Sequence, residues 1–162
     1  GRNYAFTYGN AAFLTLSTEE DLAHSPRIDW IVATLDGFQA AGYDFIFVSM
    51  HRSLYTFSMD SAPDRDLLAA VFREHGVDAV LAGHSHLYEH FLVDGVHHLV
   101  VGRAGGWPTA PDWNYDPALA ANRISVGEFQ CHLSVTVNGT NATFTVFDDT
   151  TGTVFEQFVL GP

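Results

Sequence analysis

Short apolar runs alternate with helix-like patterns in the first half of the chain. Segments 11–16, 44–50 and 77–82 are mostly apolar, as strands buried on both faces are. Between them, in segments 26–41 and 63–75, apolar residues recur every three or four positions. That spacing places them on one face of a helix. The order strand, helix, strand, helix, strand predicts two right-handed crossovers that build a parallel sheet.

The second half of the chain alternates apolar and polar residues instead. This pattern is typical of antiparallel strands with one buried face. Asp94-Gly95, Asn138-Gly139 and Thr151-Gly152 suit tight hairpin turns between such strands. Segment 102–122 lacks the pattern, and irregular segments of this length often lie near functional sites. Together with a first strand at 4–8, the expected strands are 87–93, 96–102, 128–137, 142–147 and 153–160.

Three histidines stand at the ends of two of the buried strands. His51 ends the second strand, and His84 and His86 follow the third, after a glycine that permits a sharp turn. The carboxyl ends of parallel strands meet at one edge of a sheet, where ligands of α/β proteins bind. Neutral imidazole is a common ligand of zinc, iron and manganese. A His-x-His pair alone also suits a polar loop, but with His51 the pattern predicts three imidazoles that converge on a metal site.

Most of the other histidines carry no metal-binding pattern. His75 falls in the last turn of the second helix, where a cation suits the helix dipole, and we assign it a structural role. His97 and His98 are neighbours in a strand, so they point to opposite faces and cannot both bind one ion. We expect at least one of them to be exposed. We also expect His24 and His90 to be surface residues.

The motifs around the strand-end histidines resemble those of a known family. Val48-Ser49-Met50-His51 resembles the Val-x-x-His motif of the calcineurin-like metallophosphoesterases. Gly83-His84-Ser85-His86 resembles their Gly-His-x-His motif. The flanking segments 13–19, 51–55 and 86–89 are similar to the purple acid phosphatase branch of this superfamily.

This resemblance implies a fold and a chemistry. The fold class is α/β, as the carboxyl-terminal half of a metallophosphoesterase-type two-sheet sandwich flanked by helices. Its cofactors are two divalent or trivalent metal ions (Fe, Zn or Mn), which polarise a phosphate ester and activate a bound water for attack on phosphorus. Carried over residue by residue, His51 and His84 would bind the second metal and His86 the first. The family needs no nucleophile from the protein, and we assign no catalytic residue.

Part of the family's site has no counterpart in this sequence. The first three family motifs supply aspartates, an asparagine and, in the purple branch, a tyrosine ligand, and they belong upstream of Tyr4. Three neutral histidines cannot balance the charge of two metal ions. We therefore expect residues 1–162 to form a single domain that is the carboxyl-terminal part of a catalytic domain. The amino-terminal half would come from the same precursor or from another chain, and residues 1–162 alone would be inactive.

Composition narrows the possible functions. A hydrophobic content of 47% and a charged content of 16% are those of a globular chain. The formal net charge is −12 and there is no lysine, which excludes a Walker A lysine, a Schiff-base lysine and a basic nucleic-acid footprint. No apolar run approaches the ~20 residues of a membrane span. Cys131 is the only cysteine, so no disulfide forms within the chain, and we expect it to be buried in a strand.

Two functional hypotheses from different classes remain. The first is a metal-dependent phosphoesterase, similar to a phosphomonoesterase, that hydrolyses phosphate esters in a secreted or extracellular protein once its amino-terminal half is present. The second is a catalytically degenerate phosphatase fold that serves as a structural or self-assembling interaction module. Under both, we expect another chain or another part of the precursor to cover an exposed apolar surface around Phe6, Phe13 and Leu16.

Overall fold

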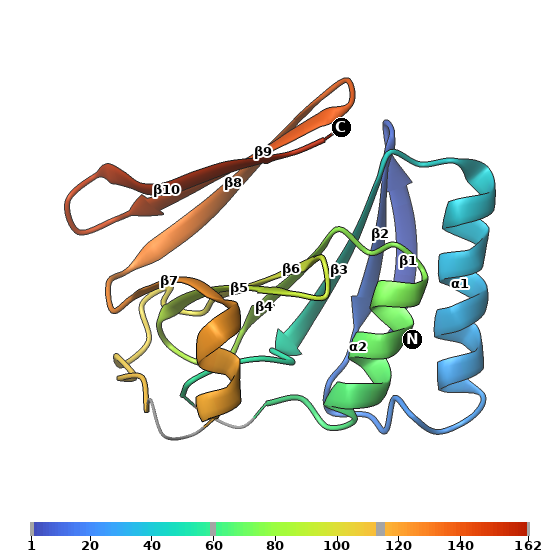
Figure 1. Cartoon of the computed structure of the whole chain (residues 1–162), viewed down its shortest axis with the longest axis horizontal. Helices are drawn as coiled ribbons and strands as arrows, with labels where there is room; N and C mark the ends of the chain where they lie inside the picture. The colour runs from blue at the N-terminus through green and yellow to red at the C-terminus, as the bar shows by residue number, and fades with distance from the viewer. Residues whose placement is uncertain (1, 59–60, 113–115, 162) are drawn as a thin grey trace.

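A seven-stranded mixed sheet forms the centre of the computed structural model, which describes residues 2–58, 61–112 and 116–161. Two helices cover one face of this sheet, and a three-stranded antiparallel sheet covers part of the other face (Figure 1). The elements in chain order are β1 (Tyr4–Tyr8), β2 (Ala11–Leu16), α1 (Arg27–Ala41), β3 (Phe45–Arg52), α2 (Arg65–Glu74), β4 (Ala79–Gly83), β5 (Tyr88–Val93), β6 (Val96–Val101), the 3-10 helix η1 (Pro117–Asn122), β7 (Arg123–Gly127), β8 (Cys131–Asn138), β9 (Asn141–Asp148) and β10 (Thr153–Leu160).

The apolar residues of the central strands are divided between two cores. Successive side chains of a strand point to opposite faces of the sheet. On β3, Ile46 and Val48 therefore pack with Leu35 of α1 in the core beneath the helices. Phe45 and Phe47 pack in the second core, against the three-stranded sheet. This arrangement confirms the expected α/β class and explains why the run at 44–50 shows no polar alternation.

The strand order sets the position of the histidines. The central sheet runs β1-β2-β3-β4-β6-β5-β7. Neighbouring strands from β2 through β3 and β4 to β6 are parallel, and α1 and α2 connect β2 to β3 and β3 to β4 as expected. Because β3 and β4 are parallel neighbours, their carboxyl ends lie at the same edge, where Arg52 pairs with Gly83.

The chain passes from the central sheet to the smaller sheet at a place that the periodicity does not mark. The strand expected at 128–137 begins only at Cys131, which is buried as expected, and β7 before it was not predicted. At the last residue of β7, a Cβ added to Gly127 would lie 2.0 Å from the ring of Phe129. The turn from β7 to β8 therefore depends on close packing at a glycine. Apolar and polar residues alternate on both sides of this turn, so the alternation alone does not show where one strand ends and the next begins. Segment 102–122 also contains η1, a helix that was not expected.

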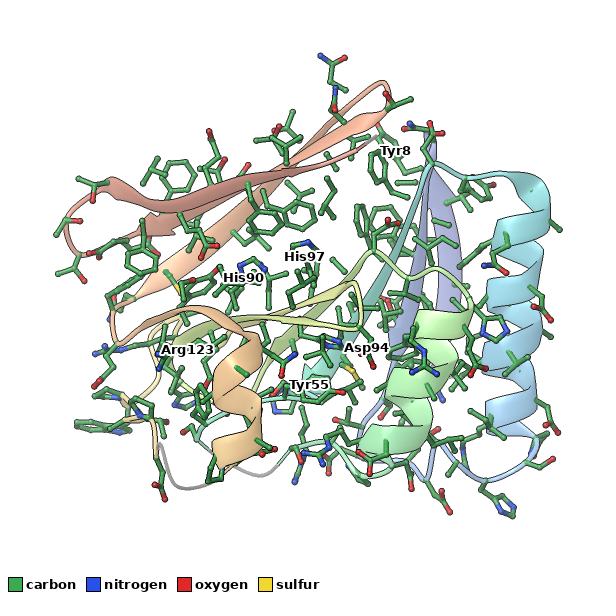
Figure 2. All side chains as sticks on the ribbon, viewed as in Figure 1. Tyr8, Tyr55, His90, Asp94, His97 and Arg123 are labelled. Atoms are coloured by element: carbon green, nitrogen blue, oxygen red, sulfur yellow. The ribbon has the colours of Figure 1, made fainter. Side chains whose placement is uncertain are left out.

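A polar cluster lies between the two sheets, and it corrects the expectation for His90. This side chain is 1% exposed and is not a surface residue. Its Nδ1 lies 2.6 Å from Oε1 of Glu156 on β10, and its Nε2 lies 2.8 Å from Nδ1 of His97. The hydroxyl of Tyr88 donates to Glu156 as well, at 2.9 Å. His90 and His97 sit in the space below the smaller sheet in Figure 2, where they join the two layers through Glu156.

The expectation that His97 or His98 would be exposed is wrong for both residues. His97 is half-buried beside His90, and burial lowers its pKa to about 4. His98 points to the opposite face, is only 3% exposed and meets the ring of Tyr55 edge-on at 4.7 Å. Burial lowers the pKa of His98 to about 3. The central sheet is covered on both faces at β6, so neither histidine is an exposed residue.

None of the helices in the described ranges has both the length and the apolar character needed to cross a bilayer.

Candidate metal centre

The structure brings His51 and His84 together at the carboxyl edge of the central sheet. His51 stands near the end of β3 and His84 directly follows β4. Nε2 of His51 lies 3.2 Å from Nδ1 of His84, and the two rings meet edge to face with their centroids 5.0 Å apart. The pairing is tertiary, since 33 residues separate the two histidines in the chain.

Two consecutive tight turns carry His84 and His86. The amide of Ser85 donates to the carbonyl of Gly83 at 2.8 Å, and the amide of Leu87 donates to the carbonyl of Ser85 at 2.9 Å. Each of these three-residue turns therefore has a histidine at its centre. His84 has φ of 66°, a left-handed conformation that is rare outside glycine. Such strain persists where the surrounding structure enforces it, and it is frequent at functional sites.

His86 is oriented by the chain that follows β6. Its Nδ1 lies 2.8 Å from the carbonyl oxygen of Trp107, and its backbone amide donates to Oγ1 of Thr109 at 3.3 Å. The carbonyl can only accept, so Nδ1 carries the proton and the lone pair of the neutral ring is on Nε2. A Cβ at Gly106 would lie 2.6 Å from the His86 ring, so the chain approaches the imidazole more closely than other residue types allow.

The loop after β2 packs beside His51. The hydroxyl of Thr18, a buried residue, accepts the amide of Arg52 at 3.2 Å. The guanidinium of Arg52 also pairs with the exposed carboxylate of Glu19 at 3.4 Å. Thr18 and Glu19, which follow β2 in the chain, therefore lie at the same edge of the sheet as the histidines.

Comparisons with known proteins give a match at the level of structure. No protein-family model matches the sequence, and no curated protein sequence does. Purple acid phosphatase PPD1 from seeds of yellow lupin (Lupinus luteus) is similar with a TM-score of 0.84 and 19% identity, over 98% of this chain and 32% of that chain. GAP50, the anchor in the inner membrane complex of Plasmodium, is similar with a TM-score of 0.72 and 16% identity, over 98% and 54% of the chains. PhoD is similar with a TM-score of 0.67 and 12% identity, over 98% and 40%.

These likenesses determine the fold. The chain has the calcineurin-like metallophosphoesterase fold. This agrees with the family that the motifs around His51, His84 and His86 resemble. The chain spans about a third of the length of the lupin phosphatase, 32% of it.

The histidine pair of this metallophosphoesterase fold has the spacing of two ligands on one ion. Zinc–nitrogen bonds are about 2.0–2.1 Å long, so two nitrogens on a tetrahedral zinc ion lie roughly 3.4 Å apart. The 3.2 Å between Nε2 of His51 and Nδ1 of His84 is close to that value. Within the described ranges, however, no group of three His, Cys, Asp or Glu side chains is arranged to hold a metal ion. The structure thus brings two of the three predicted ligands together, and His86 does not join them in such a group.

Sequence reasoning did not single out the buried polar residues behind the histidine turn. Oε2 of Glu89 accepts a hydrogen bond from Oγ1 of Thr56 at 2.6 Å, and its Oε1 accepts from the amide of Phe57 at 2.7 Å. Glu89 is 0% exposed, and burial raises the pKa of this carboxyl to about 7. Its position three residues after His86 was visible in the sequence, but the partners that bury it lie in a loop 32 residues upstream.

Proposed function

We propose that the chain provides the histidine ligands of a metal-dependent phosphoesterase. The observation that carries this proposal is the contact between Nε2 of His51 and Nδ1 of His84 at the carboxyl ends of two parallel strands. That edge is where α/β proteins bind ligands, and the two nitrogens have the separation expected of shared coordination. The fold it shares with a purple acid phosphatase and with PhoD supports the same chemistry.

The three histidines would bind two ions under this proposal. His51 and His84 would hold one ion through the two nitrogens that face each other. His86 would hold a second ion through Nε2, because a hydrogen bond from the other ring nitrogen to a backbone carbonyl is the usual support of a metal-bound histidine. Two such ions polarise a phosphate ester and lower the pKa of a bound water. The contribution of this chain is to bind and orient them.

The carboxylate ligands would come from a segment outside residues 1–162. A complete site needs anionic ligands, because neutral imidazoles leave the charge of the ions uncompensated. We propose that this segment is the amino-terminal half of the same, longer protein, or else another chain. The comparison with the lupin phosphatase supports this, since the fold match uses 32% of that protein.

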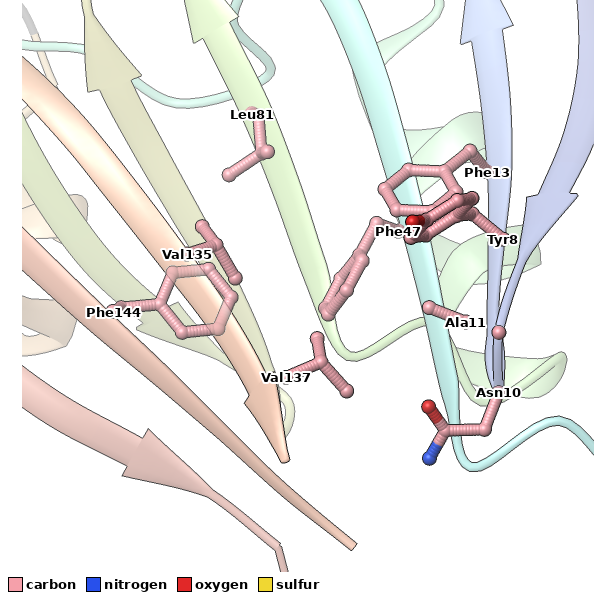
Figure 3. A pocket seen from close by; sticks show the side chains of 10 residues that line it. Tyr8, Asn10, Ala11, Phe13, Phe47, Leu81, Val135, Val137 and Phe144 are labelled. Carbon is pink, nitrogen blue, oxygen red and sulfur yellow. The ribbon is translucent and has the colours of Figure 1, made fainter. Parts of the chain in front are cut away.

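An apolar cavity marks where the additional segment would pack. It has a volume of about 350 Å³ and lies between the two sheets, with Phe13 and Phe47 on one side and Val135, Val137 and Phe144 on the other (Figure 3). The strand at this end of the central sheet, β1, has all five residues exposed. A contiguous apolar surface of this kind is typical of an interface.

One residue of the expected apolar surface is misplaced, while the covering of this surface by another segment stays a prediction. Phe6 is 47% exposed and stacks on Phe13, while Tyr4 and Tyr8 extend the same aromatic surface. Leu16 is buried on the helix side instead. The reason is the two-residue period of β2, which turns Phe13 and Leu16 to opposite faces.

The test is hydrolysis of an aryl phosphate in the presence of Zn²⁺, Mn²⁺ or Fe. The longer protein that contains this chain should turn over the substrate in a metal-dependent manner, and His84→Ala should abolish the activity. Residues 1–162 alone should be inactive, because they lack the carboxylates that balance the ions. Turnover by residues 1–162, or full activity in the His84→Ala variant, would refute the proposal. The matched control is His132→Ala, since His132 is an exposed histidine on β8 that pairs with Asp149 and has no contact with His51, His84 or His86 among the interactions described above.

One observation favours a second candidate function. The exposed aromatic edge at β1 suits self-association whether or not metal binds. A degenerate phosphatase fold used as a structural module would keep this surface and lose the metal. Sedimentation velocity in the presence of EDTA distinguishes the two. The structural module would be favoured if the protein has no phosphatase activity and forms oligomers without metal. Tyr8→Ser and Phe6→Ser should then dissociate these oligomers.

A further inference from the structure

A fully buried hydrogen-bond network lies directly behind the histidine pair. Oγ1 of Thr56 lies 2.6 Å from Oε2 of Glu89 and 3.0 Å from Oγ of Ser85. Oε1 of Glu89 accepts the amide of Phe57 at 2.7 Å, and Oγ1 of Thr56 accepts the amide of Ser58 at 3.0 Å. We call Thr56, Ser85 and Glu89 the Thr56 network.

This network joins the segments that carry the two histidines. Thr56 belongs to the segment that follows His51, in which Ser53 and Leu54 are also buried. Ser85 stands in the tight turn between His84 and His86. The contact between the hydroxyls of Thr56 and Ser85 therefore connects the segment after His51 to the turn that carries His84. The two residues are 29 positions apart in the sequence.

Glu89 anchors this connection to the central sheet. It lies on β5, and its carboxyl holds both the side chain of Thr56 and the backbone of the next residue. A carboxyl removed from water is costly unless it is hydrogen-bonded, so the buried group strongly favours the conformation that satisfies it. On the other side of the turn, Gly102 brings the chain so close that a Cβ there would lie 1.9 Å from the carbonyl oxygen of Ser85. The turn is thus held from two directions.

We propose that the Thr56 network positions His51 and His84 for metal binding, with Thr56 and Glu89 as positioning residues that touch no metal themselves. The inference rests on the proposed function in treating the pair as metal ligands. The geometry that supports it is independent of that function, because the network fixes the distance between two loops whether or not an ion is present.

The test measures Zn²⁺ affinity and amide hydrogen exchange in a small set of variants. Thr56→Val removes the shared hydroxyl at nearly constant volume. Glu89→Leu removes the anchor, and Glu89→Gln is the conservative rescue, because its amide can accept from Phe57 and donate to Thr56. The matched control is Tyr88→Phe, which removes a hydroxyl that donates to a carboxylate, as Thr56→Val does. Tyr88 precedes Glu89 on β5 and points to the opposite face, where it bonds Glu156 and not Glu89.

The expected result is a selective loss. Thr56→Val and Glu89→Leu should weaken Zn²⁺ binding on the order of 10-fold, the lower end of the effect of removing support behind metal ligands. Exchange of the amides in segments 56–58 and 84–87 should speed up in the same variants. Glu89→Gln and Tyr88→Phe should stay within about 3-fold of the wild type in affinity, a difference below 1 kcal/mol.

Several outcomes would overturn the inference. Equal Zn²⁺ affinities in Thr56→Val, Glu89→Leu and Tyr88→Phe would show that the network does no positioning. Equal losses in all three would show a general effect on stability. If Glu89→Leu does not fold, Thr56→Val decides alone.

If the histidine pair binds no metal, the Zn²⁺ and hydrogen-exchange measurements give a different combination of results. A wild-type chain that binds no Zn²⁺ would refute the proposed function, and hydrogen exchange would then decide the inference. Faster exchange at 84–87 in Thr56→Val but not in Tyr88→Phe would keep the network as the element that holds the turn. Unchanged exchange in both variants would refute it.

Discussion

Replacing His84 with glycine tests whether the turn at the candidate metal centre is strained. His84 has φ of 66°. A non-glycine residue in this region costs about 1–3 kcal/mol, which glycine would recover. Against this, glycine loses more backbone entropy on folding, about 0.5–1 kcal/mol. His84 is only half-buried, so little packing is lost. The free energy of unfolding of His84→Gly should therefore equal that of the wild type or exceed it by up to about 2 kcal/mol.

The matched control is His51→Gly. His51 lies in β3, where its pairing with β4 is irregular but its φ is not positive, so the same substitution removes the same side chain without relieving left-handed strain. It should lower the free energy of unfolding by about 1 kcal/mol, because glycine in a strand is unfavourable. Urea unfolding at 25 °C with EDTA present, followed by tryptophan fluorescence, measures both variants. Equal destabilisation by the two substitutions would show that the turn stores no strain.

Three further predictions concern the close packing behind the histidine turn and the buried titratable groups. Gly102→Ala should lower the free energy of unfolding by about 1–3 kcal/mol in urea titrations, because a Cβ would clash with the backbone of Ser85 at 1.9 Å; a neutral effect would contradict the close packing. Burial lowers the pKa values of His97 and His98 to about 4 and about 3, so only the unfolded chain takes up these protons between pH 6.5 and 4, and stability should fall as the pH falls through that window. The raised pKa of Glu89, about 7, has the opposite sign, because the folded chain takes up this proton first and gains stability between pH 7 and 4.5. Glu89→Gln removes that gain, so it should lose stability more steeply than the wild type on acidification, and parallel pH profiles would contradict the assignment.

Local patterns were sufficient to predict the elements that position the histidines. The apolar runs that became β2, β3 and β4, with helical spacing between them, led to a parallel sheet with His51 and His84 at one edge. That inference needed only the periods of strands and helices and the rule that parallel neighbours end together. The spacing within Gly-His-Ser-His also located the turn, although its left-handed residue was not foreseen.

Features that depend on distant contacts could not be predicted in the same way. Nothing in the sequence around His90 distinguishes it from an exposed histidine. Its burial is explained only by the contact with Glu156, 66 residues later in the chain. The orientation of His86 depends on the carbonyl of Trp107 in a segment without periodicity. The Thr56 network likewise joins Thr56 to Ser85 and Glu89, which lie 29 and 33 residues later, so no short stretch of the sequence contains it.

Metal binding by the pair of His51 and His84 is the property that decides the proposed function. Zn²⁺ should be titrated calorimetrically into residues 1–162 and into the variants His51→Ala, His84→Ala, His86→Ala and His132→Ala. One ion should bind the wild type, because two nitrogens 3.2 Å apart can share it. Binding should be lost in the first two variants and kept in the last two. Binding that survives in His51→Ala, or that is absent from the wild type, would contradict the assignment of this pair as a metal site.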